Sequence, residues 1–309
     1  MKIIFMGTPV FAVPILEMLF NKHEVLAVVT QPDKPVGRKK EYLFSPVKQK
    51  AFELGIKVYQ PISLKKEYQF ILDMKPDYLI TAAYGQMLPK ELLDQVTALN
   101  VHGSLLPQYR GGAPIQYALF DGLKETGVTI MYMAFQMDSG DIIKQGNVSI
   151  VEDDNYETLT YKLSSLGVKL LDIVLDDLSK GRVIREKQEP SKVTFAKTLK
   201  HEDEWISFLW STDQIINRIR GLSPDLGASA KINQTVLKFF KAIKSDIIDY
   251  NQVPGTVLQV KKKLIIKTLD GAIEITEIQA PGKKKMTVKD FLNGQNIINQ
   301  NDVFIEREK

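Results

Sequence analysis

The first half of the chain alternates short apolar runs with amphipathic segments, and this alternation restricts the fold more than any other feature. Strands that alternate with helices are typical of an α/β fold with a mostly parallel, Rossmann-like sheet and helices on both faces. Ser45 is expected to cap one helix, with Pro46 in its first turn. The pattern predicts strands over residues 2–6, 25–30, 58–59, 78–82 and 99–101, and helices over 11–20, 45–54 and 89–96.

Three polar side chains alternate where one of these strands ends. Asn100, His102 and Ser104 are two residues apart, so on an extended strand they project to the same face. Open α/β sheets place their ligands at the carboxyl ends of the strands. The alternation therefore indicates a pocket that holds an amide, an imidazole and a hydroxyl. The alternative is that His102 is a hydrogen-bonded core or surface histidine without a catalytic role.

A second segment places carboxylates after another buried strand. Residues 127–133 are apolar and β-branched, as expected of a strand, and a turn rich in Asp, Ser and Gly follows over 137–141. Asp141 lies just past this turn, where its carboxylate could orient His102 and stabilise the imidazolium cation. Turn chemistry is the preferred explanation of Asp138.

Together these segments resemble the folate-dependent formyltransferases. The resemblance rests on residues 100–102, 104–107, 109–116 and 127–141, and it implies that Asn100, His102 and Asp141 carry the reaction. It also implies 10-formyltetrahydrofolate as the formyl donor and no metal. Gln86 and Met87 stand where relatives often have two aliphatic residues. The folate-binding residues that the resemblance implies are Ser104, Leu105, Leu106 and Pro107 in one loop, and Tyr84, Gly85, Gln86 and Met87 in another.

The pattern changes near residue 185. Residues 185–203 are rich in Lys and Glu and predict a charged linker, and short strands separated by turn residues then predict a small β-barrel. The expected organisation is a catalytic domain over 1–184, a linker over 185–203 and an OB-like barrel over 204–309. Residues 220–228 and 279–286 resemble the C-terminal domain of family members that formylate initiator methionyl-tRNA. This branch transfers the formyl group to the α-amino group of methionine for translation initiation.

The charge distribution favours a nucleic-acid partner. From Glu204 onward the chain has 16 Lys and Arg against 12 Asp and Glu, whereas the preceding part has 25 of each. Cations at turns are suited to contacts with the phosphate backbone of tRNA, and the resemblance matches Arg38 to an arginine that recognises tRNA. The alternatives are a solvated loop and lysines that only keep the surface soluble. The residues expected to bind tRNA are Lys34, Arg38, Lys39 and Lys40 in one loop, and Lys261, Lys262, Lys263, Lys283, Lys284 and Lys285 in the barrel.

Several classes of protein fit the sequence poorly. No apolar run approaches 18 residues, so no membrane span is expected. The chain has no cysteine, which excludes disulfides and is in keeping with a cytoplasmic location. Of the glycines of a dinucleotide fingerprint, only Gly7 is present, so no NAD site is expected there. No obligate protein partner is evident. The open alternatives are a formyltransferase for a small amine (a glycinamide nucleotide or an amino sugar), a folate hydrolase, and a non-catalytic tRNA-binding protein.

Overall fold

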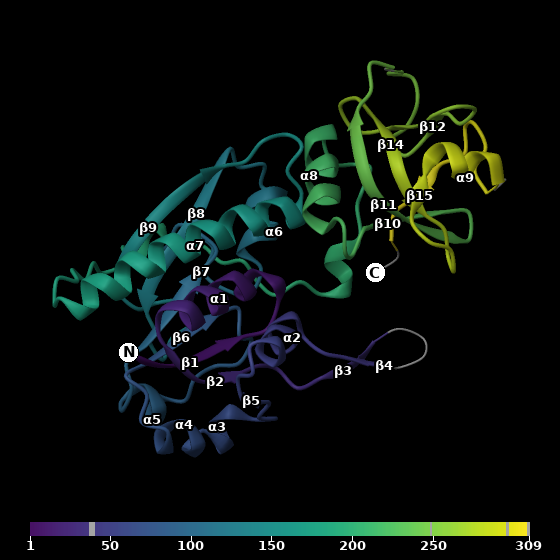
Figure 1. Ribbon diagram of the computed structural model, residues 1–309. Coiled ribbons are helices and arrows are strands. Elements are labelled where there is room, and N and C mark those ends of the chain that lie inside the picture. Colours follow the sequence, from purple (N-terminus) through teal and green to yellow (C-terminus); the bar gives the residue numbers. More distant parts are fainter. Residues whose placement is uncertain (37–40, 248, 295–296, 308–309) are drawn as a thin grey trace. The chain divides into compact units, whose positions relative to one another are not determined.

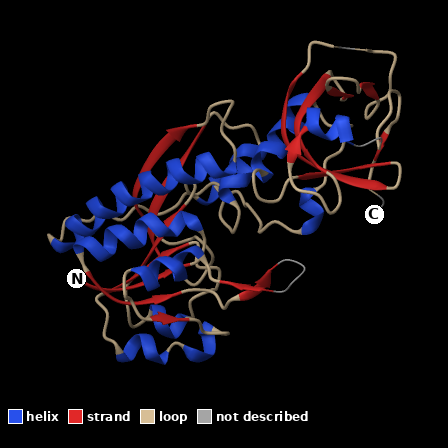
Figure 2. Ribbon diagram, turned by 45° about the vertical axis from the view of Figure 1, so that its right-hand side comes forward, coloured by secondary structure: helices blue, strands red, loops and turns tan. Residues whose placement is uncertain are grey.

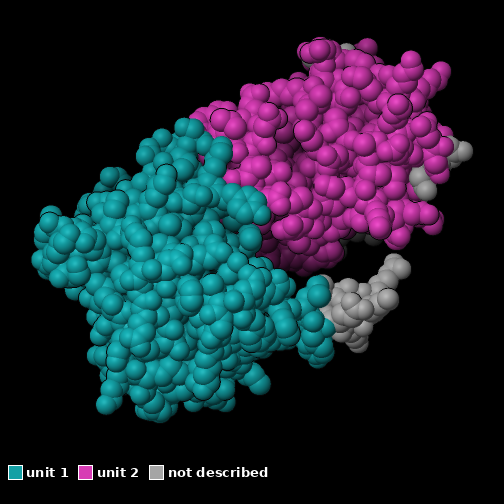
Figure 3. Space-filling model, viewed as in Figure 1, with its two compact units in different colours: residues 1–114, 125–149, 160–197 teal, residues 115–124, 150–159, 198–309 magenta. Residues whose placement is uncertain are grey.

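The computed structural model describes residues 1–36, 41–247, 249–294 and 297–307 (Figure 1). By its internal contacts the chain forms two compact units (Figure 3). Unit 1 comprises residues 1–114, 125–149 and 160–197, and unit 2 comprises residues 115–124, 150–159 and 198–309. The domain boundaries expected after residues 184 and 203 stay predictions.

Unit 1 is built on a seven-stranded sheet with the strand order β5-β2-β1-β6-β7-β8-β9. The first five of these strands run parallel to one another, and β8 and β9 add two antiparallel strands at one edge. The predicted α/β fold with a mostly parallel sheet is therefore confirmed. The strands are β1 (Lys2–Gly7), β2 (Glu24–Val29), β5 (Val58–Tyr59), β6 (Tyr78–Ala82), β7 (Ala98–His102), β8 (Glu125–Tyr132) and β9 (Ile142–Ser149).

Helices cover both faces of this sheet (Figures 1 and 2). On one face, Ile4 and Met6 of β1 pack with buried residues of α3, α4 and α5. On the other face, a Cβ on Gly167 of α7 would touch side chains of α1, β7 and β8. Alternate strand residues thus bury toward opposite helix layers, as a two-residue period requires. These helices are α1 (Val13–Lys22), α3 (Leu64–Glu67), α4 (Gln69–Asp73), α5 (Lys90–Leu93) and α7 (Tyr156–Ser179), and a 3-10 helix spans Val10–Ala12.

The long basic loop after β2 forms a hairpin of β3 (Lys34–Val36) and β4 (Glu41–Leu43). The helix α2 (Pro46–Glu53) follows it, and Ser45 caps this helix as predicted, accepting a hydrogen bond from the backbone N–H of Lys48. The buried Lys48 ammonium pairs with Asp33 at the base of the hairpin. It also donates to Gln60 Oε1 at 2.7 Å. The two ends of the hairpin are thereby fixed to the body of unit 1.

Unit 2 contains an antiparallel sheet with the order β12-β13-β14-β11-β10-β16, and β15 pairs with β14. A bridge between Thr256 and Val303 joins the two edges, so the sheet is a nearly closed barrel, as predicted. Phe239, Phe291 and Ile266 are fully buried in its core. The strands are β10 (Ala228–Ile232), β11 (Thr235–Lys244), β12 (Val257–Gln259), β13 (Leu264–Lys267), β14 (Ala272–Gln279), β15 (Met286–Thr287) and β16 (Phe304–Ile305).

Two helices of unit 2 pack against the strands of the barrel. Helix α8 (Thr212–Leu222) begins with a capping box formed by Ser211 and Gln214. Helix α9 (Val288–Gly294) packs against β14 and β15. The remaining helices are α6 (Pro114–Phe120), which belongs to unit 2 from Ile115 onward, and 3-10 helices over Pro190–Lys192 in unit 1 and His201–Glu204 in unit 2. None of the helices in the described residues combines the length and the hydropathy of a membrane-spanning segment.

Candidate active site

Strand β7 carries Asn100 and His102, two residues apart and therefore on the same face. The strand lies between β6 and β8, and its backbone pairs Asn100 with Thr81 and His102 with Thr129. The Thr81 hydroxyl donates to Asn100 Oδ1 at 2.8 Å. This contact fixes the orientation of the amide and leaves the Nδ2 donors of Asn100 for another acceptor.

The imidazole of His102 is buried, with 6% of its surface exposed. Its Nε2 lies 3.0 Å from the carbonyl oxygen of Tyr109, and its Nδ1 lies 3.8 Å from Asp138 Oδ1. Both ring nitrogens thus face acceptors, and only the cation has a proton on each of them.

The carboxylate that lies beside His102 belongs to Asp138, whereas the sequence placed Asp141 there; which aspartate takes part in the reaction stays a prediction. Asp138 has a φ of 49°, a conformation that Asp tolerates in turns, and the tight turn folds its side chain back toward Gly111. Asp141 immediately precedes β9, and its carbonyl accepts the backbone N–H of Tyr132. No ion pair joins Asp141 to His102 in the part of the chain that the structure describes. Asp138 both shapes the turn and supplies the carboxylate.

Backbone contacts hold the loop after β7 in place. Gly111 donates its N–H to Asp138 Oδ2 at 2.8 Å and has a φ of 124°, which L side chains rarely adopt. A Cβ at this position would stand 2.4 Å from the carbonyl oxygen of Ala196. Thr194 Oγ1 accepts from the N–H of Tyr109 at 2.9 Å. The segment after α7, interpreted from its charges as a linker, therefore packs directly on the candidate site.

The first predicted folate segment, Ser104 to Pro107, forms a tightly bonded loop. The buried Ser104 hydroxyl donates to the carbonyl of Gln108 at 2.7 Å. Thr129 Oγ1 donates to the carbonyl of Ser104 and accepts from the N–H of Leu106. Leu106 is buried, whereas Leu105 and Pro107 are partly exposed. These contacts fix the shape of the loop, and the role of its four residues in folate binding stays a prediction.

The second predicted folate segment has one buried, one partly buried and two exposed positions. Tyr84 packs in the core beneath the sheet, and burial raises the pKa of its hydroxyl. Gln86 accepts the N–H of Leu64 at 2.9 Å, which fixes its side chain at the start of α3. Gly85 and Met87 are exposed and can face a ligand. The structure thus separates side chains that serve the fold from those that are open to solvent.

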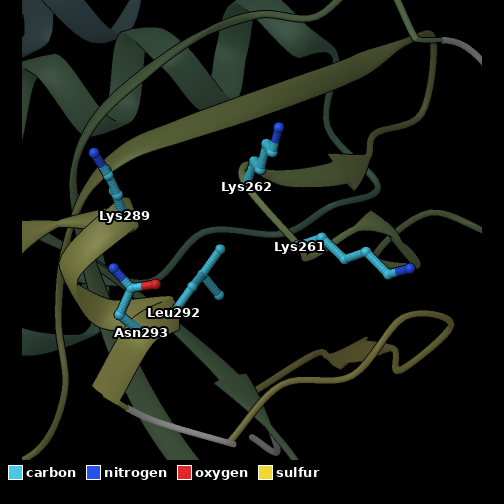
Figure 4. Close-up of a pocket in the computed structure, with 5 residues that line it drawn as sticks. All are labelled: Lys261, Lys262, Lys289, Leu292 and Asn293. Atoms are coloured by element: carbon cyan, nitrogen blue, oxygen red, sulfur yellow. The ribbon is translucent and has the colours of Figure 1, made fainter.

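Only some of the basic residues expected to bind tRNA lie in the part of the chain that the structure describes. Lys34 is exposed on β3, whereas Arg38, Lys39 and Lys40 lie outside the described residues. In unit 2, residues 261–263 form the β12–β13 turn and 283–285 follow β14. Lys263 pairs with Glu274 at 2.7 Å and Lys285 with Glu277 at 3.1 Å. A hollow of this unit is lined by Lys261, Lys262, Lys289, Leu292 and Asn293 (Figure 4).

Two family models match this chain. The model described as formyl transferase covers residues 1–175, and the model described as formyl transferase, C-terminal domain, covers residues 198–296. The chain therefore belongs to the formyl transferase family, which confirms the resemblance carried by residues 100–116 and 127–141. Within that family, its curated relatives bear the name methionyl-tRNA formyltransferase. The protein of Listeria innocua is 47% identical over 298 residues, and that of Staphylococcus epidermidis is 48% identical over 299; the matches cover 95% of this chain and 95% and 96% of the relatives.

More distant solved structures share the fold. HypX from Aquifex aeolicus in complex with tetrahydrofolic acid matches with a TM-score of 0.66 and 18% identity. The match covers 100% of this chain and 51% of HypX, so the chain spans about half of that protein. An N-formyltransferase from Helicobacter canadensis, solved with folinic acid and dTDP-3-aminofucose, matches with a TM-score of 0.67 and 21% identity over 91% of this chain and 99% of its own. At these identities the likeness concerns the fold alone.

Proposed function

We propose that this protein transfers the formyl group of 10-formyltetrahydrofolate to the α-amino group of methionine on initiator methionyl-tRNA, in the cytoplasm. The observation that carries the proposal is the 47% identity to a methionyl-tRNA formyltransferase over 95% of both chains. That match extends through both units, including the barrel that holds the excess of positive charge. The grouping of Asn100, His102 and Asp138 in unit 1 supports a catalytic role rather than tRNA binding alone.

The reaction starts when the free amine of the methionyl group attacks the formyl carbon of the folate. A carbon–nitrogen bond forms, and the formyl oxygen takes up negative charge in a tetrahedral intermediate. Asn100 Nδ2 donates to this oxyanion, because Thr81 already occupies the carbonyl side of the amide. A fixed donor stabilises the developing charge without reorientation at the moment of reaction.

The intermediate then breaks the bond between the formyl carbon and the folate nitrogen. That nitrogen takes up a proton, and the attacking amine loses one. His102 is the proposed proton donor to the leaving nitrogen. The distance of 3.8 Å between its Nδ1 and Asp138 Oδ1 is too long for a direct hydrogen bond. Asp138, placed by Gly111, stabilises the imidazolium and takes the role that the sequence had assigned to Asp141.

The two substrates are assigned to different surfaces. We assign folate to the loop of residues 104–107 and to the exposed Gly85 and Met87. We assign tRNA to Lys34 and to Arg38, because a guanidinium can make bidentate contacts to a base edge or a phosphate. The lysines of residues 261–263 and 283–285 are suited to the phosphate backbone, and their contribution falls as salt rises.

One assay separates this function from the alternatives. Formylation is measured on initiator methionyl-tRNA, elongator methionyl-tRNA and an amino-sugar nucleotide, each with 10-formyltetrahydrofolate. We expect efficient formylation of the initiator only. Preferential formylation of the sugar would indicate a small-amine transferase, and release of tetrahydrofolate without any acceptor would indicate a hydrolase. Binding of tRNA without formyl transfer would leave only a tRNA-binding protein.

A further inference from the structure

The side chain of Gln188 lies against the turn that carries Asp138. Its Nε2 donates to the carbonyl oxygens of Asp138 at 2.8 Å and of Gly140 at 2.9 Å. Its Oε1 accepts two hydrogen bonds from the guanidinium of Arg110, from Nε at 3.0 Å and from the terminal NH2 at 2.7 Å. The amide of Gln188 therefore uses both of its ends to join two loops that are far apart in the sequence.

The turn has little freedom to move once these contacts form. Gly140 is buried, and a Cβ there would stand 1.8 Å from the carbonyl oxygen of Tyr132. The Asp138 carboxylate is bonded to the N–H of Gly111, the residue after Arg110. Arg110 itself pairs with the segment after α7 through its N–H to Thr194 and its carbonyl to Ala196. Gln188 thus connects the backbone of the turn to the loop that holds its carboxylate.

We propose that Gln188 is a positioning residue for formyl transfer, because it holds Asp138 at the distance from His102 that the reaction needs. This proposal rests on the proposed function, in which Asp138 stabilises the cation of His102. Gln188 touches neither reacting group, and its effect passes through the backbone of residues 138 and 140. The segment after α7 is therefore part of the catalytic machinery and more than a connection to the barrel.

Glutamine is suited to this position because two carbonyl oxygens and one guanidinium meet there. An amide supplies a donor group to the carbonyls and an acceptor to Arg110. A glutamate would keep the bond to Arg110 but would place a carboxylate against two carbonyl oxygens. The variant Gln188→Glu therefore breaks only the contact with the turn, whereas Gln188→Leu removes both contacts.

The kinetic test compares Gln188→Glu and Gln188→Leu with the native enzyme, and uses Glu189→Gln on the neighbouring exposed residue as the control. We expect both Gln188 variants to lower kcat by about 10- to 100-fold, the scale of a small misplacement at a catalytic group. The KM values for 10-formyltetrahydrofolate and methionyl-tRNA should stay within about twofold, because binding surfaces are untouched. A normal kcat in the Gln188→Glu variant, with its bond to Arg110 intact, would overturn the proposal.

A double-mutant cycle separates positioning of Asp138 from a general effect on the fold. In an Asp138→Asn background, Gln188→Glu should cost almost nothing further, since the group that it positions is already lost. Additive losses would overturn the proposal. Hydrogen exchange in residues 136–142, read by mass spectrometry without any substrate, should rise in Gln188→Glu and stay unchanged in Glu189→Gln. An activity loss with unchanged exchange would also overturn it, whereas increased exchange with a harmless Asp138→Asn would refute the proposed role of Asp138 instead.

Discussion

Strand β7 and the turn at residues 136–141 meet at the same site, but they are held in different ways. Asn100 and His102 belong to a strand with neighbours on both sides, so ladder hydrogen bonds fix their backbone. Asp138 belongs to a turn outside the sheet, and its position depends on single bonds from Gly111 and Gln188. One half of the site is fixed by the architecture, and the other half by a few polar contacts.

This difference predicts how each half responds to change. Substitutions on β7 remove chemistry but leave the strand in place, because the ladder does not depend on those side chains. Substitutions around the turn change where a carboxylate lies, and they do so from positions far along the chain. Losses on the strand should therefore be large and local, whereas losses at the turn should be graded and coupled.

The largest effect is expected at His102. The variant His102→Ala should lower kcat by about 100-fold or more, because it removes the proposed proton donor. Its thermal unfolding curve should match that of the native protein, because the fold stays intact. The control is His201→Ala, which changes a histidine exposed in the 3-10 helix of unit 2. Near-normal turnover of His102→Ala would refute the proposed role of His102 as the proton donor.

The next effect distinguishes the two aspartates. We expect Asp138→Asn to lower kcat by about 10- to 100-fold, because the cation of His102 loses its opposite charge. Asp141→Asn should stay within about twofold of the native rate. Single-turnover rates on methionyl-tRNA measure both. If Asp141→Asn were the damaging change, the proposed role of Asp138 would be refuted.

A smaller effect is expected at Thr81, which orients Asn100 from the neighbouring strand. The variant Thr81→Val keeps the shape and removes the hydroxyl, so kcat should fall by about tenfold as the amide loses its fixed orientation. The matched control Thr81→Ser keeps the donor and should retain most of the activity. Equal rates for both variants would mean that the strand ladder alone orients Asn100.

The smallest effect on catalysis is expected in unit 2. Asp270 accepts the backbone N–H of Thr212 at the start of α8. This hydrogen bond is the main reason why the pKa of the Asp270 carboxyl lies below its usual value. A lowered pKa stabilises the fold above the unfolded pKa, and the gain is lost as the pH falls through the folded pKa. Asp270→Ala should cost about 1 kcal/mol of stability at pH 7, as for a lost helix cap.

Thermal unfolding at pH 7 and pH 3 measures this difference. The native protein and Asp270→Ala should differ at pH 7 and converge toward pH 3. Asp270→Asn keeps an oxygen acceptor and should lie between them. Formyl transfer at pH 7 should be equal in all three proteins. A gap that widened in acid would contradict the direction of the pKa shift.

The strand half of the site could be predicted because its pattern is local. Asn100, His102 and Ser104 stand at alternate positions within five residues, and the alternation is visible in the printed sequence. Their place at a strand end also follows from the fold class, which the strand and helix periodicities indicated. The barrel could be predicted for the same reason, since short strands and their turns are local patterns.

The turn half could not be predicted in the same way. Asp138 was interpreted as a turn residue, and it is one, but the same carboxylate also faces His102. Local sequence does not show which way a turn folds back. Gln188 and Thr194 are uncharged residues in a segment rich in lysine and glutamate. The charges of that segment predict a solvated linker, so the sequence analysis identified neither residue as part of the site. Their contacts span 48 to 85 residues, beyond the reach of any periodicity.

The position of Gln188 late in the chain also determines when, during synthesis, the active site is complete. Gln188 follows Asp138 by 50 residues, and Thr194 follows Tyr109 by 85. At ordinary speeds of translation the ribosome adds 50 residues in about 3 to 10 seconds. A nascent chain can therefore contain a complete β7, with Asn100 and His102 in place, while Asp138 still lacks the hydrogen bond from Gln188. We expect catalytic competence to arrive with the emergence of residues 188–196, as one of the last events in the synthesis of unit 1.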